Sequence, residues 1–420
     1  MKADTRPPIA TAALFSPYWL GGLRLPNRIV MAPLTRARAD EHGVPSPLAA
    51  EYYAQRAGAG LIIAEATAVS RQGTGYDNWP GLYTAAQEAG WRTITEAVHA
   101  AGGRIFVQLF HAGRMSHPSF HQGELPAGPS PIAAGPATEL YDGVHPFTQP
   151  RALRAAELAG IAEQFRAAAE RALAAGFDGV EVHAGNGYLV DQFLRDGANQ
   201  RDDAYGGNPR NRARLLREVT EAVISVWGES RVGARISSLS PTNGMTDADP
   251  VATFTQAARD LAALGVGYLH VIEPGVNGTL SDPASAQSPE LGSGFFRPLF
   301  PGAIIAAGGH TAATGTARIE RDQANLIAYG QLFIANPDLP TRFQLSAPLA
   351  RPQRATFYGG GATGYTDYPP LSQPALDQLG GIVGHDDPAA RVAQRYRERA
   401  YSSAVRPMRW TESRVSGLSS

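Results

Sequence analysis

The sequence predicts an α/β protein, a (β/α)8 TIM barrel with an N-terminal hairpin and a C-terminal extension. Short apolar runs alternate with longer segments of helical periodicity along most of the 420 residues, as expected for parallel strands joined by helices. The run at 179–182 ends in the polar residues His183, Asn186 and Tyr188, and such barrels carry their chemistry at the carboxyl ends of the strands. Glycine-rich turns follow two late runs, at 308–309 and at 330, where this fold usually binds phosphate.

The composition excludes several classes of function. A formal net charge of -1 gives no electrostatic reason to expect a nucleic-acid or anionic-membrane partner. The first residues, MKADTRPPIA, place charges and prolines where a signal peptide has its apolar core, so we expect a cytoplasmic protein. The absence of cysteine excludes disulfides and cysteine-bound metal clusters. Lys2 is the single lysine, which excludes Schiff-base chemistry inside the barrel.

The first third of the chain predicts the start of the barrel. Residues 13–28 are expected to form the hairpin, which turns at Gly21–Gly22, and 29–31, 60–63 and 104–108 are the first three strands. Residues 47–56 predict a helix. The segment 113–150 is rich in proline and glycine and is long for a connection without secondary structure, so we expect a lid over the catalytic face; a loop without a role in catalysis is the alternative.

The remaining elements follow the same alternation. Helices are expected at 155–175, 211–227 and 250–264, and further strands at 231–236, 268–272, 302–307 and 327–329. We expect the barrel to span 14–369 and a partly helical extension to span 370–420, with an amphipathic helix starting at Asp386. The apolar face of that helix needs a cover, which can be the barrel or a second subunit; a frayed tail is the alternative. The protein is therefore expected to be a monomer or a homodimer.

The polar residues after strand 179–182 suggest a reaction type. His183 and Asn186 can each donate a hydrogen bond, and the Tyr188 phenol can donate a proton. Two donors near one proton source suit a reaction that builds negative charge on a carbonyl oxygen. Arg235 lies in an otherwise apolar strand and needs an anion or an acceptor, because an unpaired buried charge is costly. A structural ion pair is the alternative for Arg235.

These residues belong to a longer pattern. His183-x-x-Asn186-x-Tyr188-Leu is followed by Asp-Gln-Phe-Leu at 191–194, and then by Asn199, Arg201, Asp203, Tyr205, Gly206, Gly207, Asn211 and Arg212. The pattern resembles the old yellow enzyme family, whose members are FMN-dependent ene-reductases on a (β/α)8 barrel. Motifs at 31–36 and 357–369 extend the resemblance from residue 14 to residue 369.

The resemblance implies a role for each candidate residue. Pro33 packs against the flavin ring, the Thr35 hydroxyl bonds its O4/N5 edge, Gln108 bonds its imide edge and Arg235 faces N1/O2. The full cofactor set is Pro33, Leu34, Thr35, Ala66, Gln108, Arg235, Gly308, Gly309, Gly330 and Gln331. His183 and Asn186 hold the substrate oxygen, Tyr188 supplies the proton, and Tyr76, Phe110 and Tyr358 shape the substrate pocket.

Position 331 departs from the family pattern, which has arginine before Ile-Ala-Asn-Pro-Asp-Leu. Gln331 removes a forked, charged set of donors from the phosphate. Hydrogen bonds to charged groups contribute about 1.5–3 kcal/mol each, so the change predicts an FMN affinity lower by about ten- to a hundredfold.

The function implied by the resemblance is reduction of an activated C=C bond, such as that of an α,β-unsaturated carbonyl, in a small-molecule substrate. FMN is the expected cofactor and NAD(P)H the reductant, with no metal. One alternative is a flavin-dependent isomerase, desaturase or cyclase in a biosynthetic pathway. A second is a barrel with weakened or lost FMN binding that acts as a binding protein. Stoichiometric consumption of NAD(P)H distinguishes a reductase from the first alternative, and measured FMN binding tests the second.

Overall fold

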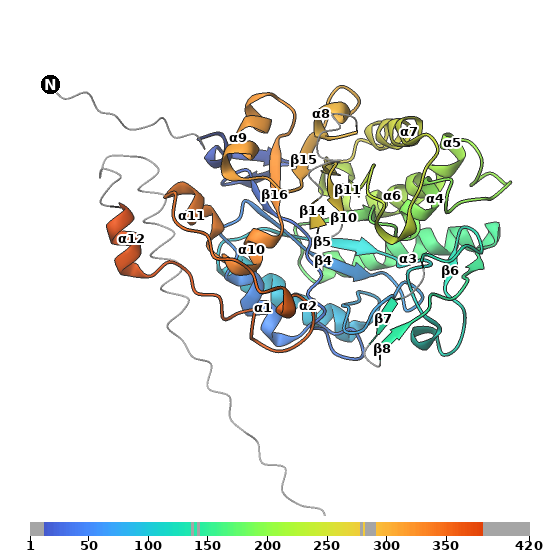
Figure 1. The fold of residues 1–420 in the computed structure, drawn as a ribbon, viewed down its shortest axis with the longest axis horizontal. Helices are drawn as coiled ribbons and strands as arrows, with labels where there is room; N and C mark the ends of the chain where they lie inside the picture. The colour runs from blue at the N-terminus through green and yellow to red at the C-terminus, as the bar shows by residue number, and fades with distance from the viewer. Residues whose placement is uncertain (1–11, 136–137, 141–142, 278–279, 282–290, 381–420) are drawn as a thin grey trace, which may run out of the picture. The chain divides into compact units, whose positions relative to one another are not determined.

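A computed structural model describes residues 12–135, 138–140, 143–277, 280–281 and 291–380 (Figure 1). The chain divides into two compact units, residues 1–372 and 373–420, and this boundary lies close to the one expected after residue 369. In the second unit the structure describes α12 (Gln373–Gly380). The helix expected from Asp386 lies outside the described residues.

The first unit is built on a closed barrel of parallel strands, which confirms the predicted fold class. In chain order the strands are β3 (Ile29–Met31), β4 (Leu61–Ala68), β5 (Ile105–Phe110), β10 (Gly179–Ala184), β11 (Val232–Ile236), β12 (Tyr268–Ile272), β15 (Ala303–Ala307) and β16 (Leu326–Tyr329). Each strand pairs with its neighbours in this same order, and β16 pairs with β3 to close the barrel. The carboxyl ends of all these strands therefore meet at one face.

Helices cover the outside of the barrel (Figure 1). They include α1 (Pro47–Ala54), α2 (Ala85–Ala100), α3 (Ala155–Ala174), α4 (Leu189–Leu194), α7 (Pro250–Ala263), α9 (Ala312–Glu320), α10 (Gln331–Ala335) and α11 (Leu339–Gln344). The helix expected at 211–227 is divided at Ala213 into α5 (Pro209–Arg212) and α6 (Arg214–Trp227). Side-chain N-caps begin several helices. Thr84 caps α2 in a capping box with Gln87, and Asp249 caps α7 before Pro250.

The barrel interior is apolar at its amino end and polar at its carboxyl end. Alternate strand residues such as Val30, Phe106 and Ile305 form a buried interior cluster. The hairpin of β1 (Tyr18–Leu20) and β2 (Leu23–Leu25) contributes Leu20, Leu23 and Leu25 to the same cluster. The polar strand residues lie beyond it, so the apolar end supports the fold and the opposite end is available for chemistry.

The segment 113–150 contains more structure than the sequence predicted. It carries the short 3-10 helix Pro118–His121, the strand β6 (Ala127–Gly128), which pairs with β9 (Arg151–Ala152), and the hairpin of β7 (Thr138–Leu140) and β8 (Gly143–His145). Met115, Ala134 and Phe147 from this segment belong to one apolar cluster with Trp79 and Phe110. The segment is therefore anchored beside the carboxyl face of the barrel.

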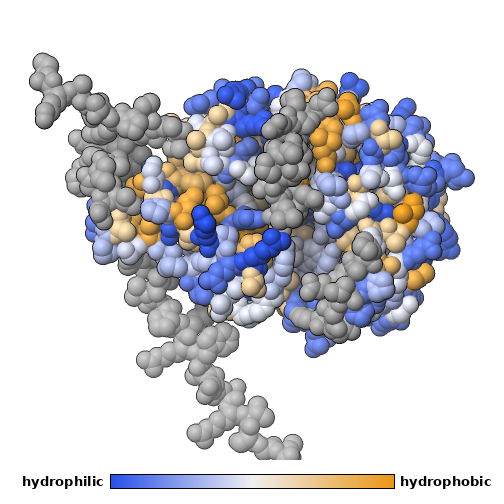
Figure 2. Space-filling model, in the orientation of Figure 1, coloured by the Kyte–Doolittle hydropathy of each residue, from blue (hydrophilic) through white to orange (hydrophobic). Residues whose placement is uncertain are grey.

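The surface is mixed in character. Figure 2 shows hydrophobic patches separated by hydrophilic residues on the face that it draws. Among the described residues, the exposed large apolar side chains belong to separate elements and include Trp19, Leu173 and Val251. None of the described helices combines the length and the apolar character needed to cross a membrane.

Candidate active site

A cavity of about 1030 Å³ opens at the carboxyl ends of the barrel strands. Its walls come from segments at or after the ends of β3, β4, β10, β11, β12, β15 and β16. The candidate residues that line it are Pro33, Leu34, Thr35, Tyr76, Asn186, Tyr188, Arg235, Gly308, Gly309, Gly330, Gln331 and Tyr358. The fold thus brings together residues from positions 33 to 358 of the chain at one site.

His183, Ala66, Gln108 and Phe110 are the candidates that do not line this cavity, and they lie on the barrel strands β10, β4 and β5. His183 pairs with Arg235 on the neighbouring strand, and Ala66 pairs in the same way with Gln108. The Phe110 ring lies 5.3 Å from that of Tyr188. All four are buried, so they support or extend the walls of the cavity.

The end of β10 displays the proposed donors. Asn186 (φ 56) and Gly187 (φ 77) adopt left-handed backbone conformations, which asparagine and glycine tolerate better than other residues. This tight turn brings Tyr188 back toward the strand, so that its ring lies 5.3 Å from that of His183. The chain then enters α4 directly after Tyr188.

The environment of His183 keeps its imidazole neutral. Burial, Arg235 and His270 together hold the pKa of His183 well below its usual value. Its Nδ1 atom is buried without a hydrogen-bond partner among the described residues. A neutral imidazole donates one hydrogen bond, so His183 can polarise a bound carbonyl without carrying a charge itself.

Tyr188 remains a protonated phenol at neutral pH. Burial, together with Tyr76 and Tyr358, raises the pKa of Tyr188 well above its usual value. Its ring packs edge-on against Phe110 and Trp79, the latter at 5.9 Å. These contacts fix the phenol at the cavity wall in the protonation state that a proton donor needs.

A buried carboxylate organises the layer beneath these residues. Glu181 accepts hydrogen bonds from Nε2 of Gln108 (2.7 Å) and from Nδ1 of His270 (2.8 Å). His270 is also the register partner of Arg235. Sequence reasoning missed Glu181, although the same signal that identified Arg235, a charged residue within an apolar strand, was available for it.

Arg235 carries the positive charge at the centre of the site. Burial lowers the pKa of Arg235, and the charge of Glu181 opposes this shift. Its Nε atom is buried and has no hydrogen-bond partner among the described residues. A cation with an open donor in a cavity wall fits the electron-rich N1/O2 edge of a flavin better than it fits a structural ion pair.

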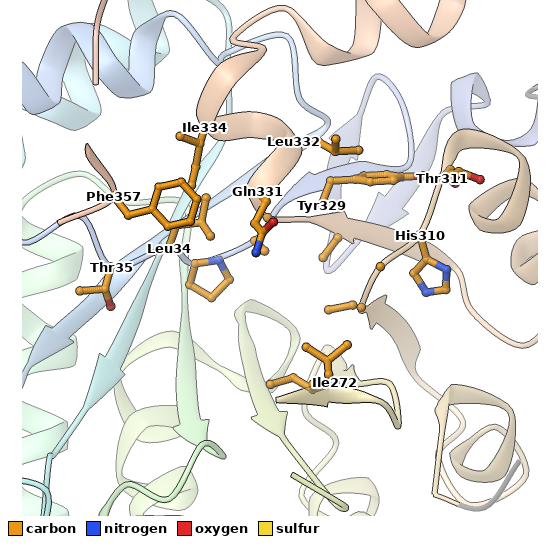
Figure 3. A pocket seen from close by; sticks show the side chains of 18 of the residues that line it. Leu34, Thr35, Ile272, His310, Thr311, Tyr329, Gln331, Leu332, Ile334 and Phe357 are labelled. Atoms are coloured by element: carbon orange, nitrogen blue, oxygen red, sulfur yellow. Dashed lines mark hydrogen bonds between the residues drawn. The ribbon is translucent and has the colours of Figure 1, made fainter. Parts of the chain in front are cut away.

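Two glycines in the turns after β15 and β16 leave little room for a side chain. A Cβ on Gly308 (φ +144) would lie 2.6 Å from Cγ2 of Val276, and one on Gly330 would lie 3.2 Å from Cδ2 of Leu34. Figure 3 shows Gln331 in the middle of the pocket, with His310 and Thr311 on one side of it. Of the cations nearby, Arg342 already binds Asp338 at 2.7 Å. The backbone amides of these turns and the Gln331 side chain are groups that could donate to a phosphate at this end.

The cavity thus fits FMN. Arg235 supplies an open cation and the glycine turns supply accessible backbone. Because Nε2 of Gln108 binds Glu181, its Oε1 can accept from the flavin imide N–H. Sequence reasoning also missed Asn243, which lines the cavity, because it lies in a loop without a recognisable pattern.

The barrel and this cavity define a flavin-binding (β/α)8 oxidoreductase. The model of the NADH:flavin oxidoreductase / NADH oxidase family matches residues 13–349, and the chain belongs to this family. It is 43% identical over 379 residues to 12-oxophytodienoate reductase 7 of Oryza sativa subsp. japonica, covering 86% of this chain and 96% of the relative. It is 41% identical over 367 residues to 12-oxophytodienoate reductase 2 of Arabidopsis thaliana, with 86% and 96% covered.

Solved structures agree with this assignment. Morphinone reductase in complex with tetrahydroNAD is 46% identical, with a TM-score of 0.80 and coverage of 86% of this chain and 98% of that one. The old yellow enzyme homologue from Zymomonas mobilis is 43% identical, with a TM-score of 0.82 and coverage of 86% and 100%. The chain is therefore an FMN-dependent oxidoreductase that reduces activated C=C bonds with NAD(P)H. The isomerase, desaturase, cyclase and binding-protein alternatives find no support among these relatives.

Proposed function

We propose that the substrate is a small α,β-unsaturated carbonyl compound, held through its oxygen by His183 and Asn186 and protonated by Tyr188. The observation that carries this proposal is the pairing of a neutral His183 with a protonated Tyr188 whose ring lies 5.3 Å away. The two residues flank one turn, so they can act on one bound molecule. Tyr76, Trp79 and Phe110 form an aromatic group around Tyr188, which favours a flat, apolar substrate.

Each residue has a separate task in the proposed mechanism. Thr35, Gln108, Arg235 and the glycine turns would hold FMN, which when bound would supply the hydride taken from NAD(P)H. His183 and Asn186 donate to the carbonyl oxygen and stabilise the negative charge that develops there. Tyr188 gives its phenolic proton to the α-carbon and is reprotonated from solvent. The aromatic group limits access of water to the reacting bond.

The test removes the donors one at a time. With cyclohex-2-enone as substrate, His183→Ala and Asn186→Ala should each lower kcat/KM by about a hundred- to a thousandfold, as expected for a lost oxyanion donor. The wild-type protein should consume one NAD(P)H for each cyclohexanone formed. A donor variant with unchanged kcat/KM would contradict its assigned role, and product formed without NAD(P)H would contradict net reduction.

We also propose the domain boundaries, the cellular location and the oligomeric state of the enzyme. We propose that residues 14–369 form the catalytic unit, with 370–420 as an extension; the cavity walls end at Tyr358, which supports this division. Dependence on NAD(P)H supports a cytoplasmic location. The net charge of -1 supports a protein without a nucleic-acid partner, acting as a monomer or a homodimer.

A further inference from the structure

The turn that carries Asn186 is held from the neighbouring loop after β11. The backbone N–H of Asn186 donates to Oγ of Ser237 at 2.7 Å. Its carbonyl oxygen accepts from Nδ2 of Asn243 at 2.6 Å. Both partners lie more than fifty positions further along the chain, so the conformation of this turn depends on a separate segment.

Helix α4 holds the other half of the turn. The N–H of Gly187 donates to Oδ2 of Asp191, and its carbonyl oxygen accepts from Nε2 of Gln192, both at 2.8 Å. Every backbone polar group of residues 186 and 187 is therefore bonded to a side chain. A backbone dipeptide bonded in this way is restrained, because movement of the turn would break hydrogen bonds that are buried at Gly187 and partly buried at Asn186.

The backbone of Asn186 needs this restraint. A non-glycine residue at φ 56 is unfavourable and persists only where its surroundings determine it. The loop after β11 also packs closely against the turn, since a Cβ on Gly187 would lie 2.7 Å from Cβ of Asn243.

The loop after β11 is itself fixed in place. Nη2 of Arg114 donates to the carbonyl oxygens of Asn243 (3.3 Å) and Gly244 (3.2 Å). Arg114 is 1% exposed, so this clamp is internal. Asn243 therefore presents its amide to Asn186 from a rigid backbone.

We propose that Ser237 and Asn243 are positioning residues of the reductase reaction, which hold Asn186 in the conformation that binds the substrate oxygen. The inference rests on the proposed function of Asn186 and adds two residues that act through it. Asn243 also lines the cavity, so direct contact with the substrate is the competing explanation. The two explanations differ in what happens when Asn186 is already absent.

A double-mutant cycle separates them. The dissociation constant of cyclohex-2-enone is measured on the oxidised holoenzyme from the change in flavin absorbance, without NAD(P)H. Asn243→Leu should raise this constant about tenfold, because small displacements of a donor cost much of its effect. In an Asn186→Ala background the same substitution should have no further effect. The FMN dissociation constant should stay unchanged in all variants.

Ser237→Ala provides a second route if Asn243→Leu loses FMN. It should weaken enone binding in the same way, whereas Ser240→Ala, in the same loop but bonded to Thr242 rather than to the turn, should not. An additive effect of Asn243→Leu in the Asn186→Ala background would overturn the positioning role in favour of direct contact. Unchanged enone binding in both Asn243→Leu and Ser237→Ala would overturn it outright. Unchanged binding in Asn186→Ala would contradict the proposed function itself, and the inference with it.

Discussion

Glu181 binds Nε2 of Gln108 at 2.7 Å, entirely inside the barrel. This contact determines which end of the Gln108 amide would be open to a bound flavin. It also places a negative charge in the layer below Arg235, where few mobile dipoles can screen it. Glu181, which does not line the cavity, thus arranges the donor and the charge that we propose face the flavin.

Substitution of Glu181 should change the reduction potential of bound FMN. Glu181→Gln removes a buried negative charge near a cofactor that gains negative charge on reduction, so the potential should rise by on the order of 30 mV for the two-electron couple. Arg235→Gln removes the positive charge and should shift the potential in the opposite direction. Dye equilibration under anaerobic conditions measures both values, and shifts of the same sign would contradict this electrostatic arrangement.

Tyr188→Phe should separate the two halves of the reaction. Reduction of the flavin by NAD(P)H should be unaffected, because the phenol takes no part in it. Oxidation by cyclohex-2-enone should slow by about a hundred- to ten-thousandfold, as expected for loss of a general acid. Stopped-flow absorbance follows each half-reaction separately, and an unchanged rate of alkene reduction would contradict the role of Tyr188.

Gln331→Arg should strengthen FMN binding. A forked cation at the phosphate end adds about 1.5–3 kcal/mol of charged hydrogen bonding, which corresponds to about a ten- to hundredfold lower dissociation constant. Gln331→Met, without charge or donors, serves as the control and should show no gain. Fluorescence titration measures both, and equal affinities for the arginine and methionine variants would show that the phosphate does not contact position 331.

His111 should make stability depend on pH. Burial lowers the pKa of His111 to about 3, so below pH 6.5 the unfolded chain binds a proton that the folded chain does not. The free energy of unfolding therefore falls as the pH falls from 6.5 toward 3. His111 alone should lower it by about 2 kcal/mol at pH 5. His111→Gln should lose less stability between pH 7 and pH 5 in denaturant titrations with excess FMN. Equal losses of stability in the wild-type protein and in His111→Gln would contradict a lowered pKa of His111 in the folded protein.

The sequence predicted those parts of the site that lie on one strand or in one local motif. His183, Asn186 and Tyr188 follow a single strand, and Arg235 was visible as a charge in an apolar run. The Glu181 network was not predicted, because its partners Gln108 and His270 lie 73 and 89 positions away and only closure of the barrel brings them together. Ser237 and Asn243 were missed because they lie in a loop without a recognisable pattern, and their contacts with Asn186 span 51 and 57 positions.

The boundaries of elements differ where tertiary contacts extend or divide them. Strand β4 continues to Ala68 through an irregularity between Ala64 and Ala66, because its polar end stays paired with β5. The predicted helix at 211–227 is divided at Ala213. The helices α2 and α9 were not predicted; α9 consists largely of small residues, which give a weak periodic signal.

A single turnover without oxygen tests most directly whether this cavity is the site of alkene reduction. The holoenzyme is reduced with one equivalent of NAD(P)H and mixed with cyclohex-2-enone while the flavin absorbance is followed. We expect rapid reoxidation of the flavin and one cyclohexanone for each FMN, and slow reoxidation in the Tyr188→Phe variant. A flavin that stays reduced until oxygen is admitted would contradict the assignment of this cavity as the site of alkene reduction.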